Sequence, residues 1–170
     1  MTQPGGARDD RRRARAHGGR RRSAARLAAA QALYQIELGG GSVEEVVQDF
    51  IRHRLAEIAG QGFVPADEAL FADIVRGAAR RRDELDNMIA GVLAEPWRVD
   101  RLETILHVIL RAAAYELSAR PDVPPRVTVN EYVDLADAFF GGKETALVNG
   151  VLDRLARALR PDEMDARARG

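Results

Sequence analysis

Basic side chains are concentrated in one short run of this sequence, where they could bind a polyanion. The run contains four arginines and one serine, namely Arg20, Arg21, Arg22, Ser23 and Arg26. Guanidinium groups bind phosphates through paired N–H donors, and a helix that starts at Arg20 would add free backbone N–H groups to the same site. This run therefore predicts a phosphate-binding site.

Aromatic side chains supply the second chemical feature. Tyr34 follows the basic run, and Phe139 and Phe140 precede a glycine pair and Lys143. Aromatic rings stack on unpaired bases, so arginines combined with rings are what single-stranded RNA requires. The alternatives stay open, because Tyr34 and Phe139 would serve equally well as core side chains. Lys143, at the start of a helix, contacts either a phosphate or nothing.

Catalytic and metal-binding patterns are missing from the sequence. There is no cysteine, and the three histidines do not form the H-E-x-x-H pattern that binds zinc. The string from Gly141 to Thr145 resembles part of a phosphate loop, but Asp137 stands where that loop requires a glycine. Glu103 and His107 lie one helical turn apart, and we interpret this pair as structural and assign it no chemistry. We therefore expect no enzyme activity, no cofactor and no metal.

The charge is distributed unevenly along the chain. Residues 1–26 carry a net charge of +7, and the remaining residues carry −7, although the whole chain is neutral. Such asymmetry suggests a polyanion-binding arm on an acidic body. The alternative is that the arginines are only solvated or bind the protein's own acidic surface.

The composition favours an all-α fold. Apolar residues make up 46% of the chain but aromatic residues only 5%, and alanine, leucine and arginine dominate. Neither a signal peptide nor a membrane span is visible in the sequence, and the absence of cysteine permits a reducing compartment. We therefore predict a cytoplasmic protein.

Apolar periodicity and capping signals predict a compact bundle of about seven helices in two small subdomains. Capping boxes are expected at Ser42 with Glu45 and at Thr128 with Glu131, Asp100 is expected to cap a central helix, and a helix break is expected near Asp83. The predicted helices cover 20–38, 42–58, 67–94, 101–119, 128–139 and 143–159.

Three regions follow from this pattern. Residues 1–19, rich in arginine and glycine and without apolar periodicity, are predicted to form a disordered basic tail. Residues 20–160 form the helical domain, and residues 161–170 form a polar C-terminal tail.

Three segments occur in order along the chain, namely RRRSAARLAAAQALYQ, ILRAAAYELSARPDVPPRVTVNEYVDLADAFF and ALVNGVLDRLA. In these segments and in the distances between them, the sequence resembles the NusB family of bacterial transcription antitermination factors over roughly residues 20–160.

The resemblance implies a function without catalysis. Proteins of this kind bind the boxA sequence of ribosomal-RNA leaders together with a small-subunit ribosomal protein, also known as NusE, within the RNA polymerase antitermination complex that holds the other Nus factors. The RNA would pass Arg20, Arg21, Arg22 and Arg26 and reach the aromatic side chain at Phe139.

Three positions depart from the family pattern. Phe140 replaces a glycine, so either phenylalanine is a candidate for stacking; Leu106 replaces an acidic residue, and Ala146 replaces a lysine. Two rival interpretations remain, a helical protein-interaction or dimerisation module and the RNA-binding part of a ribosomal-RNA cytosine methyltransferase. Because the chain ends at Gly170, we expect no catalytic domain of that second kind.

Overall fold

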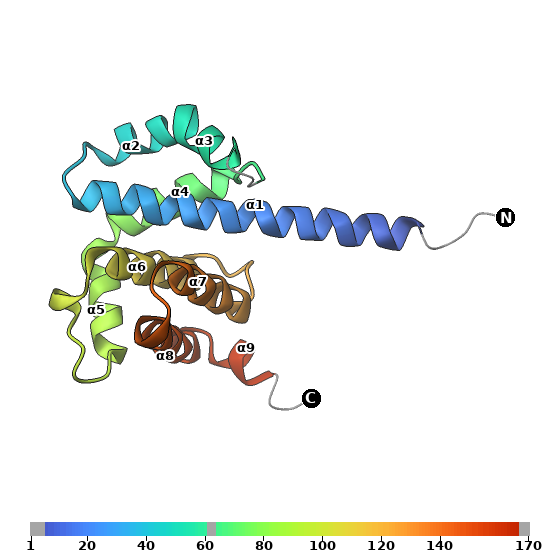
Figure 1. Cartoon of the computed structure of the whole chain (residues 1–170). Helices are drawn as coiled ribbons and strands as arrows, with labels where there is room; N and C mark the ends of the chain where they lie inside the picture. Colours follow the sequence, from blue (N-terminus) through green and yellow to red (C-terminus); the bar gives the residue numbers. More distant parts are fainter. Residues whose placement is uncertain (1–5, 61–63, 167–170) are drawn as a thin grey trace.

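The computed structural model describes residues 6–60 and 64–166 (Figure 1). The regular structure in these ranges is helical, which confirms the all-α prediction. In chain order the elements are α1 (Gly6–Glu37), α2 (Val43–Asp49), a π-helical turn (Phe50–Arg54), α3 (Leu55–Gly60), α4 (Glu68–Arg80), α5 (Arg82–Val92), a 3-10 turn (Val99–Arg101), α6 (Thr104–Ala119), α7 (Pro125–Phe139), α8 (Gly142–Leu159) and α9 (Pro161–Asp165).

Helix α1 lies between two groups of helices. In Figure 1, α2 and α3 lie on one side of it and α6, α7 and α8 lie on the other. Both α1 and α4 pack on α6, and α5 connects the two groups. The two small subdomains therefore share one continuous apolar core. Alanines line much of the buried face of α1, and such small side chains let neighbouring helices approach closely; they are Ala24, Ala25, Ala28, Ala29 and Ala32.

Helix α6 is the centre of the bundle, as its wide apolar stripe predicts. It contacts α1, α4, α5, α7 and α8. Its buried residues include Leu106, Ile109, Leu110 and Leu117, which are at most 2% exposed. The crossing with α4 is tight, because a Cβ atom at Gly77 would lie 2.0 Å from Cζ of Tyr115.

The capping predictions have mixed outcomes. At the start of α2, the Glu45 backbone N–H donates to Ser42 Oγ over 3.2 Å and the Ser42 N–H donates to Glu45 Oε2 over 3.1 Å, so this capping box is confirmed. The capping box predicted at Thr128 with Glu131 is wrong, since α7 already begins at Pro125. Proline suits the first helical position because it lacks an N–H.

Two helix boundaries also differ from the prediction. Asp100 lies in the 3-10 turn and does not cap α6, which begins at Thr104. The break between α4 and α5 occurs at Arg81, two residues before the expected position.

Over residues 6–19 the structure describes a helix in the segment that was predicted to be a disordered tail. Helix α1 begins at Gly6, and residues 1–5 lie outside the described residues. Arginine and alanine have high helix propensity, and extending an existing helix costs far less free energy than nucleating one. The packed part of α1 therefore acts as a nucleus from which the helix continues toward the N-terminus.

The C-terminal segment is also more structured than a polar tail. Arg160 is followed by α9, whose Met164 is only 2% exposed. The Arg126 guanidinium donates from Nη2 to the Met164 carbonyl over 2.8 Å. This short helix thus closes over the start of α7, and residues 167–170 lie outside the described residues.

A partly buried charge cluster joins α1, α5 and α6. Arg111 donates from Nη1 to Glu37 over 2.8 Å and from Nε to Asp86 over 2.6 Å. His107 Nε2 lies 2.7 Å from Asp86 Oδ1, so His107 pairs with Asp86 and its role is structural. Burial lowers the pKa of His107 below 6.5, and the positive charge of Arg111 lowers it further, although Asp86 opposes the shift.

This lowered pKa of His107 predicts a pH-dependent stability. The unfolded chain takes up a proton on this histidine near pH 6.5, while the folded protein takes it up only at lower pH, so the free energy of unfolding should fall as the pH falls through 6.5. Urea unfolding at about pH 7.5 and about pH 5.5 measures the difference. His107→Gln keeps a donor for Asp86 without titrating and should flatten the dependence; an unchanged slope would contradict this assignment.

Candidate nucleic-acid interface

The three arginines at 20–22 lie inside helix α1 and not at its start. Their backbone N–H groups are used within the helix, so the predicted contribution of free N–H groups to phosphate binding is wrong. All three side chains are exposed. Because consecutive helical residues point about 100° apart, Arg20, Arg21 and Arg22 project in three different directions and do not form a single cluster.

Each of these arginines therefore faces different surroundings. Arg21 turns toward the loop before α4 and donates from Nε to the Pro65 carbonyl over 3.4 Å. Arg20 lies within about 40° of Tyr34 on the helix surface, about 21 Å along the axis, because the two residues are nearly four turns apart. Arg20 is thus the arginine that shares a face of α1 with an aromatic ring.

Ser23 is used inside the protein. Its hydroxyl lies 2.7 Å from Glu131 Oε2 on α7 and 3.0 Å from the Gly19 carbonyl oxygen. The single hydroxyl proton serves one of these acceptors at a time. Ser23 therefore ties α1 to α7, and its side chain is only partly exposed.

Arg26 is the clearest correction to the predicted site. Its side chain is 3% exposed, and it donates from Nε and Nη2 to the two carboxylate oxygens of Glu116 over 2.9 and 3.0 Å. Nη1 lies 3.7 Å from Glu131. Burial alone would lower the pKa of Arg26, but the hydrogen bond and the charge of Glu116 raise it. The side chain is thus a buried structural cation, because α1 turns this face to α6.

The acidic partners of Arg26 were missed from the sequence. Glu116 is fully buried in the most apolar helix, α6, and Tyr132 beside it is also fully buried. Burial, together with the negative charge of Glu116, raises the pKa of Tyr132 well above 10.0, so the phenol stays neutral. A glutamate within a long apolar run was the available signal, because a buried carboxylate requires a cationic partner.

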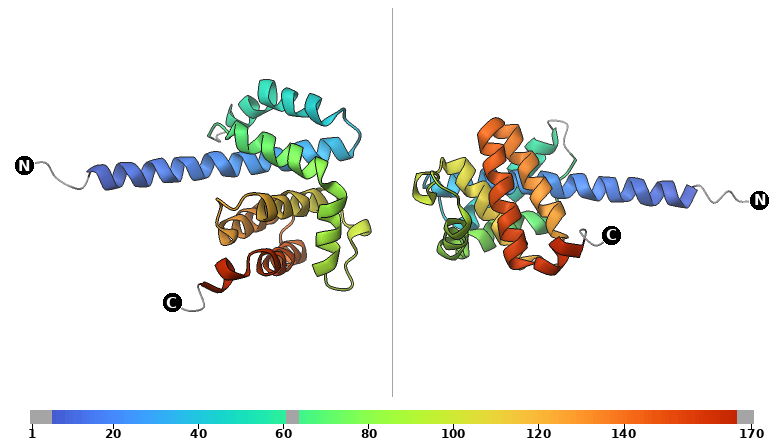
Figure 2. Two further views of the ribbon diagram at one scale, coloured as in Figure 1. Left: turned by 180° about the vertical axis from the view of Figure 1, so that it is seen from behind. Right: turned by 90° about the horizontal axis from the view of Figure 1, so that it is seen from below.

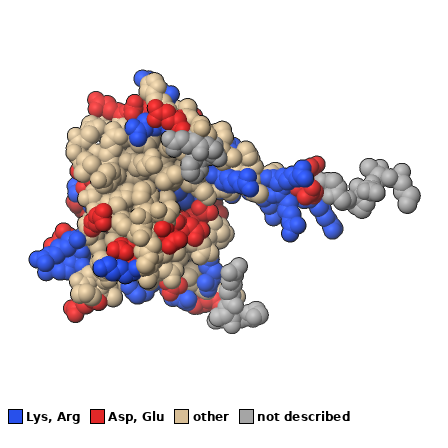
Figure 3. All heavy atoms as spheres, viewed as in Figure 1, with Lys and Arg blue, Asp and Glu red and all other residues tan. Residues whose placement is uncertain are grey.

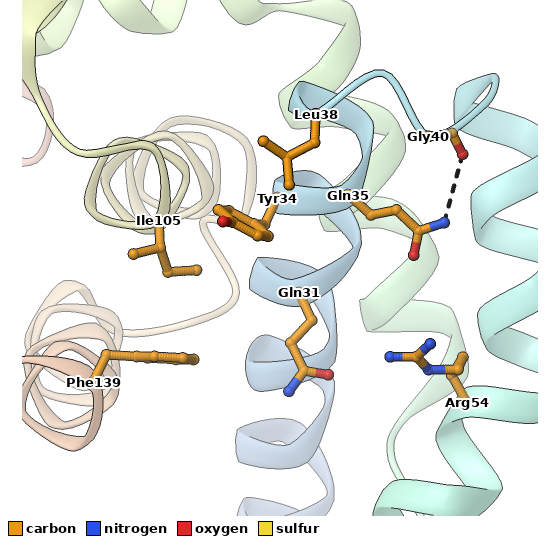
Figure 4. A pocket seen from close by; sticks show the side chains of 8 residues that line it. All are labelled: Gln31, Tyr34, Gln35, Leu38, Gly40, Arg54, Ile105 and Phe139. Carbon is orange, nitrogen blue, oxygen red and sulfur yellow. Dashed lines mark hydrogen bonds between the residues drawn. The ribbon is translucent and has the colours of Figure 1, made fainter.

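Two of the predicted aromatic residues meet in one groove of about 540 Å³ (Figure 4). Tyr34 of α1 is 38% exposed and Phe139 of α7 is 43% exposed, so Phe139 does not belong to the buried face of α7. Both rings face the groove. The other lining residues are Gln31, Gln35, Leu38, Gly40, Arg54 and Ile105.

The groove combines apolar and hydrogen-bonding groups. In Figure 4, Ile105 of α6 lies on the side of the rings, and Gln31 and Arg54 lie on the opposite side. The Gln35 amide donates to the Gly40 carbonyl over 3.5 Å. Rings that stack on bases next to amide and guanidinium groups suit unpaired nucleotides.

The structure distinguishes the two neighbouring phenylalanines. Phe140 is half-buried and packs against the core, whereas Phe139 is exposed to the groove. Their ring centroids are 6.4 Å apart and the rings are tilted by 46°. Phe139 is therefore the better placed of the two for stacking, and Phe140 packs against the core beside it.

Lys143 lies outside the groove. It is exposed in the first turn of α8, after a turn formed by Gly141 and Gly142. Both glycines have positive φ values, 69° and 58°, which side chains strongly disfavour. This turn orients α7 against α8, and it leaves Lys143 on a separate part of the surface.

Positive charge gathers on the part of α1 that extends beyond the body, while both signs are mixed over the body in the view of Figure 3. Within residues 6–60 and 64–166, no group of three histidine or carboxylate side chains is arranged to hold a metal. Over those residues, no helix is both long and apolar enough to cross a membrane.

Comparisons with known proteins agree with this architecture. The model of the NusB family matches residues 23–157. The transcription antitermination protein NusB of Rhodopseudomonas palustris (strain BisB18) is 49% identical over 144 residues, covering 84% of this chain and 85% of the relative. The protein of the same name from Bradyrhizobium sp. (strain BTAi1) is 48% identical over 145 residues, covering 85% and 86%.

Solved structures show the same fold. T. maritima NusB superposes with a TM-score of 0.66 at 29% identity, covering 85% of this chain and 96% of that one. A structure of antitermination factors NusB and NusE in complex with dsRNA superposes with a TM-score of 0.60 at 27% identity, covering 80% and 96%. Sequence and structure therefore lead to one assignment: this chain belongs to the NusB family.

Proposed function

We propose that this protein is a transcription antitermination factor that binds the boxA RNA of ribosomal-RNA leader transcripts. Its membership of the NusB family supports this role. The related structure that holds NusB and NusE with dsRNA supports binding to RNA and to a ribosomal protein of the NusE type. The role is non-enzymatic and belongs to the bacterial cytoplasm, where the protein joins the other Nus factors on RNA polymerase.

One structural observation carries the proposal. Tyr34 and Phe139, which are 105 positions apart in the sequence, are brought to one groove from α1 and α7. Arg20 lies on the same face of α1, about 21 Å away along the helix axis. RNA that stacks on the rings can therefore continue along α1 and place its phosphates at Arg20.

Specificity for boxA would arise on a joint surface with the ribosomal protein. The groove is lined largely by exposed apolar groups, including Leu38 at 64% exposure, which suit a protein partner beside the RNA. Each ligand would then strengthen the binding of the other by the same factor.

A fluorescence-anisotropy titration tests this recognition. A boxA-type RNA and a scrambled RNA of equal length and composition are each titrated with the protein alone and with the ribosomal protein present. The proposal predicts that both RNAs bind the protein alone and that the ribosomal protein selectively tightens binding of the boxA-type RNA. Equal affinities of the two RNAs in the presence of the ribosomal protein would contradict the proposal.

Arginine-to-glutamine changes at Arg20 and Arg22 should weaken binding by removing phosphate contacts. Each lost contact with single-stranded RNA lowers the slope of log K against log salt by about 0.7. The measurement is the affinity at several salt concentrations. The matched control is Arg98→Gln with Arg101→Gln, two exposed arginines outside the groove, which should leave the slope unchanged. Equal effects of the two pairs would contradict the assignment.

Self-association through the same groove is the second candidate function. Its exposed apolar side chains, Leu38, Tyr34 and Phe139, would be covered in a dimer. Sedimentation of the wild-type protein and of Leu38→Ser over a range of concentrations distinguishes the two functions. A dimer that Leu38→Ser dissociates, combined with RNA binding that does not change, would favour the dimerisation module.

A further inference from the structure

Helix α1 continues well beyond the body of the protein. Figures 1 and 2 show its N-terminal part extending away from all the other helices. The side chains of residues 8–17 are exposed, and their only apolar members are alanines. The segment thus has no apolar face to bury, and its helical form gains nothing from packing.

Arginines form a stripe along this projecting segment. Arg8, Arg11, Arg12 and Arg15 follow the spacing i, i+3, i+4 and i+7, which places them on one face of a helix. Arg22 continues this face two turns further on. The acidic residues lie off the stripe, and Asp9 pairs with Arg13 over 3.3 Å. The stripe is therefore uniformly positive.

The direction of the stripe follows from the packed part of α1. Arg26, about one turn beyond Arg22 on the same face, points at Glu116 of α6. The stripe accordingly faces the side of the molecule that carries α6 and α7, and Figure 3 shows basic side chains gathered along that side of the arm. Among the described residues, none of the arginines at 8, 11, 12 and 15 has a carboxylate within salt-bridge distance.

Gly18 and Gly19 lie where the arm leaves the body. A Cβ atom at Gly18 would meet only Arg22 Nη1, at 3.6 Å, and one at Gly19 would meet nothing within 4 Å. Neither has a positive φ. Packing and backbone geometry therefore do not require these glycines, and each weakens the helix by about 1 kcal/mol relative to alanine. The intrinsic helix propensity of α1 is therefore low at the point where the arm joins the body.

We propose that residues 8–22 form a second RNA-binding element, in which the arginine stripe contacts phosphates of the RNA that flanks the segment held by the Tyr34–Phe139 groove. Guanidinium groups are the best phosphate ligands among side chains, and a stripe from Arg8 to Arg22 extends about 21 Å along the helix axis. Residues 8–19 precede both Arg20, where the resemblance to the family begins, and residue 23, where the match to the family model begins, so this part of the arm lies outside both. It rests on the proposed function, because the RNA is the one held at the groove, and it adds contacts to phosphates, which do not read sequence.

The test compares two charge-matched triple variants. The first is Arg8→Gln, Arg11→Gln and Arg15→Gln, and the control is Arg80→Gln, Arg98→Gln and Arg101→Gln, all exposed and away from the arm. Glutamine has nearly the same helix propensity as arginine, so the arm stays as helical as before. Each protein is titrated with a boxA-type RNA of about 6 nucleotides and with one of about 30 nucleotides. At about 3.4 Å per stacked nucleotide, the short RNA spans about 20 Å, which reaches from the groove to Arg20 but not along the arm.

The arm variant should lower the salt slope for the long RNA by about 2, from three lost contacts, and its affinity by up to about 100-fold at 0.1 M salt. The arm variant should leave the affinity for the short RNA nearly unchanged, and the control variant should leave the affinities for both RNAs unchanged. Equal losses in the two variants, or equal losses on the two RNAs, would overturn the proposal. Selectivity for boxA over a scrambled RNA in the presence of the ribosomal protein is measured separately, so the arm and the proposed function can fail independently.

Discussion

Replacing Glu116 with alanine is expected to destabilise the folded protein by about 3–5 kcal/mol. The change leaves the Arg26 guanidinium, whose side chain is 3% exposed, without its bidentate partner. An unpaired buried charge costs far more free energy than the ion pair contributes when it is intact. Because domains are stable by only about 5–15 kcal/mol, the variant should unfold at much lower urea concentrations or fail to fold at 37 °C, roughly physiological temperature.

Two further variants separate charge burial from loss of packing. Arg26→Met combined with Glu116→Met removes both charges and keeps most of the volume, so the double variant should recover much of the lost stability. Glu44→Ala removes an exposed pair with Arg76 and should have a far smaller effect. Urea unfolding compares the three proteins. If the double variant were as unstable as Glu116→Ala, the cost would lie in packing and not in the unpaired charge.

Phe139→Ala is expected to weaken RNA binding by about 1–3 kcal/mol, which is about 5- to 150-fold in affinity. The ring is 43% exposed and faces the groove beside Tyr34, so its removal takes away a stacking surface with little loss of core contacts. The measurement is an anisotropy titration with boxA-type RNA, accompanied by urea unfolding. The free energy of unfolding should be nearly unchanged.

Phe140→Ala is the matched control for this prediction. Phe140 is half-buried and packs against the core, so its truncation should reduce the free energy of unfolding more than that of Phe139 does. RNA affinity measured well below the unfolding transition should change less. If Phe140→Ala reduced affinity more than Phe139→Ala, the ring at 140 would be the stacking residue.

Sequence periodicity predicted the parts of the fold that depend on local patterns. The apolar stripe from Leu102 to Leu117 marked α6 as the central helix, and the Ser42–Glu45 pair marked the start of α2. These two predictions are correct because a helix buries one continuous face and because a capping box is complete within four residues. Tyr34 and Phe139 were recognised for the chemistry of their rings, but their common groove depends on how α1 and α7 pack.

Long-range pairing explains what the sequence could not reveal. Arg26 belongs to the same basic run as Arg20 and Arg22, and its partners Glu116 and Glu131, 90 and 105 positions away, make it a core residue. Ser23 was assigned to the RNA site for the same reason, because its structural partner Glu131 is 108 positions away and could not be recognised locally. The structure describes residues 6–19 as part of α1, and that helical state depends on a nucleus outside the segment, which local composition does not reveal.

The central claim is that this protein and a small-subunit ribosomal protein form one RNA-binding surface that recognises boxA. A thermodynamic cycle tests it most directly, with boxA-type and scrambled RNA each titrated in the absence and presence of the ribosomal protein, at two salt concentrations. The account predicts that the ribosomal protein tightens binding of boxA selectively by about 5- to 150-fold, and that boxA tightens binding of the ribosomal protein by the same factor. Equal binding of the two RNAs, with no change when the ribosomal protein is added, would contradict the claim and leave the arginines as a nonspecific polyanion-binding arm.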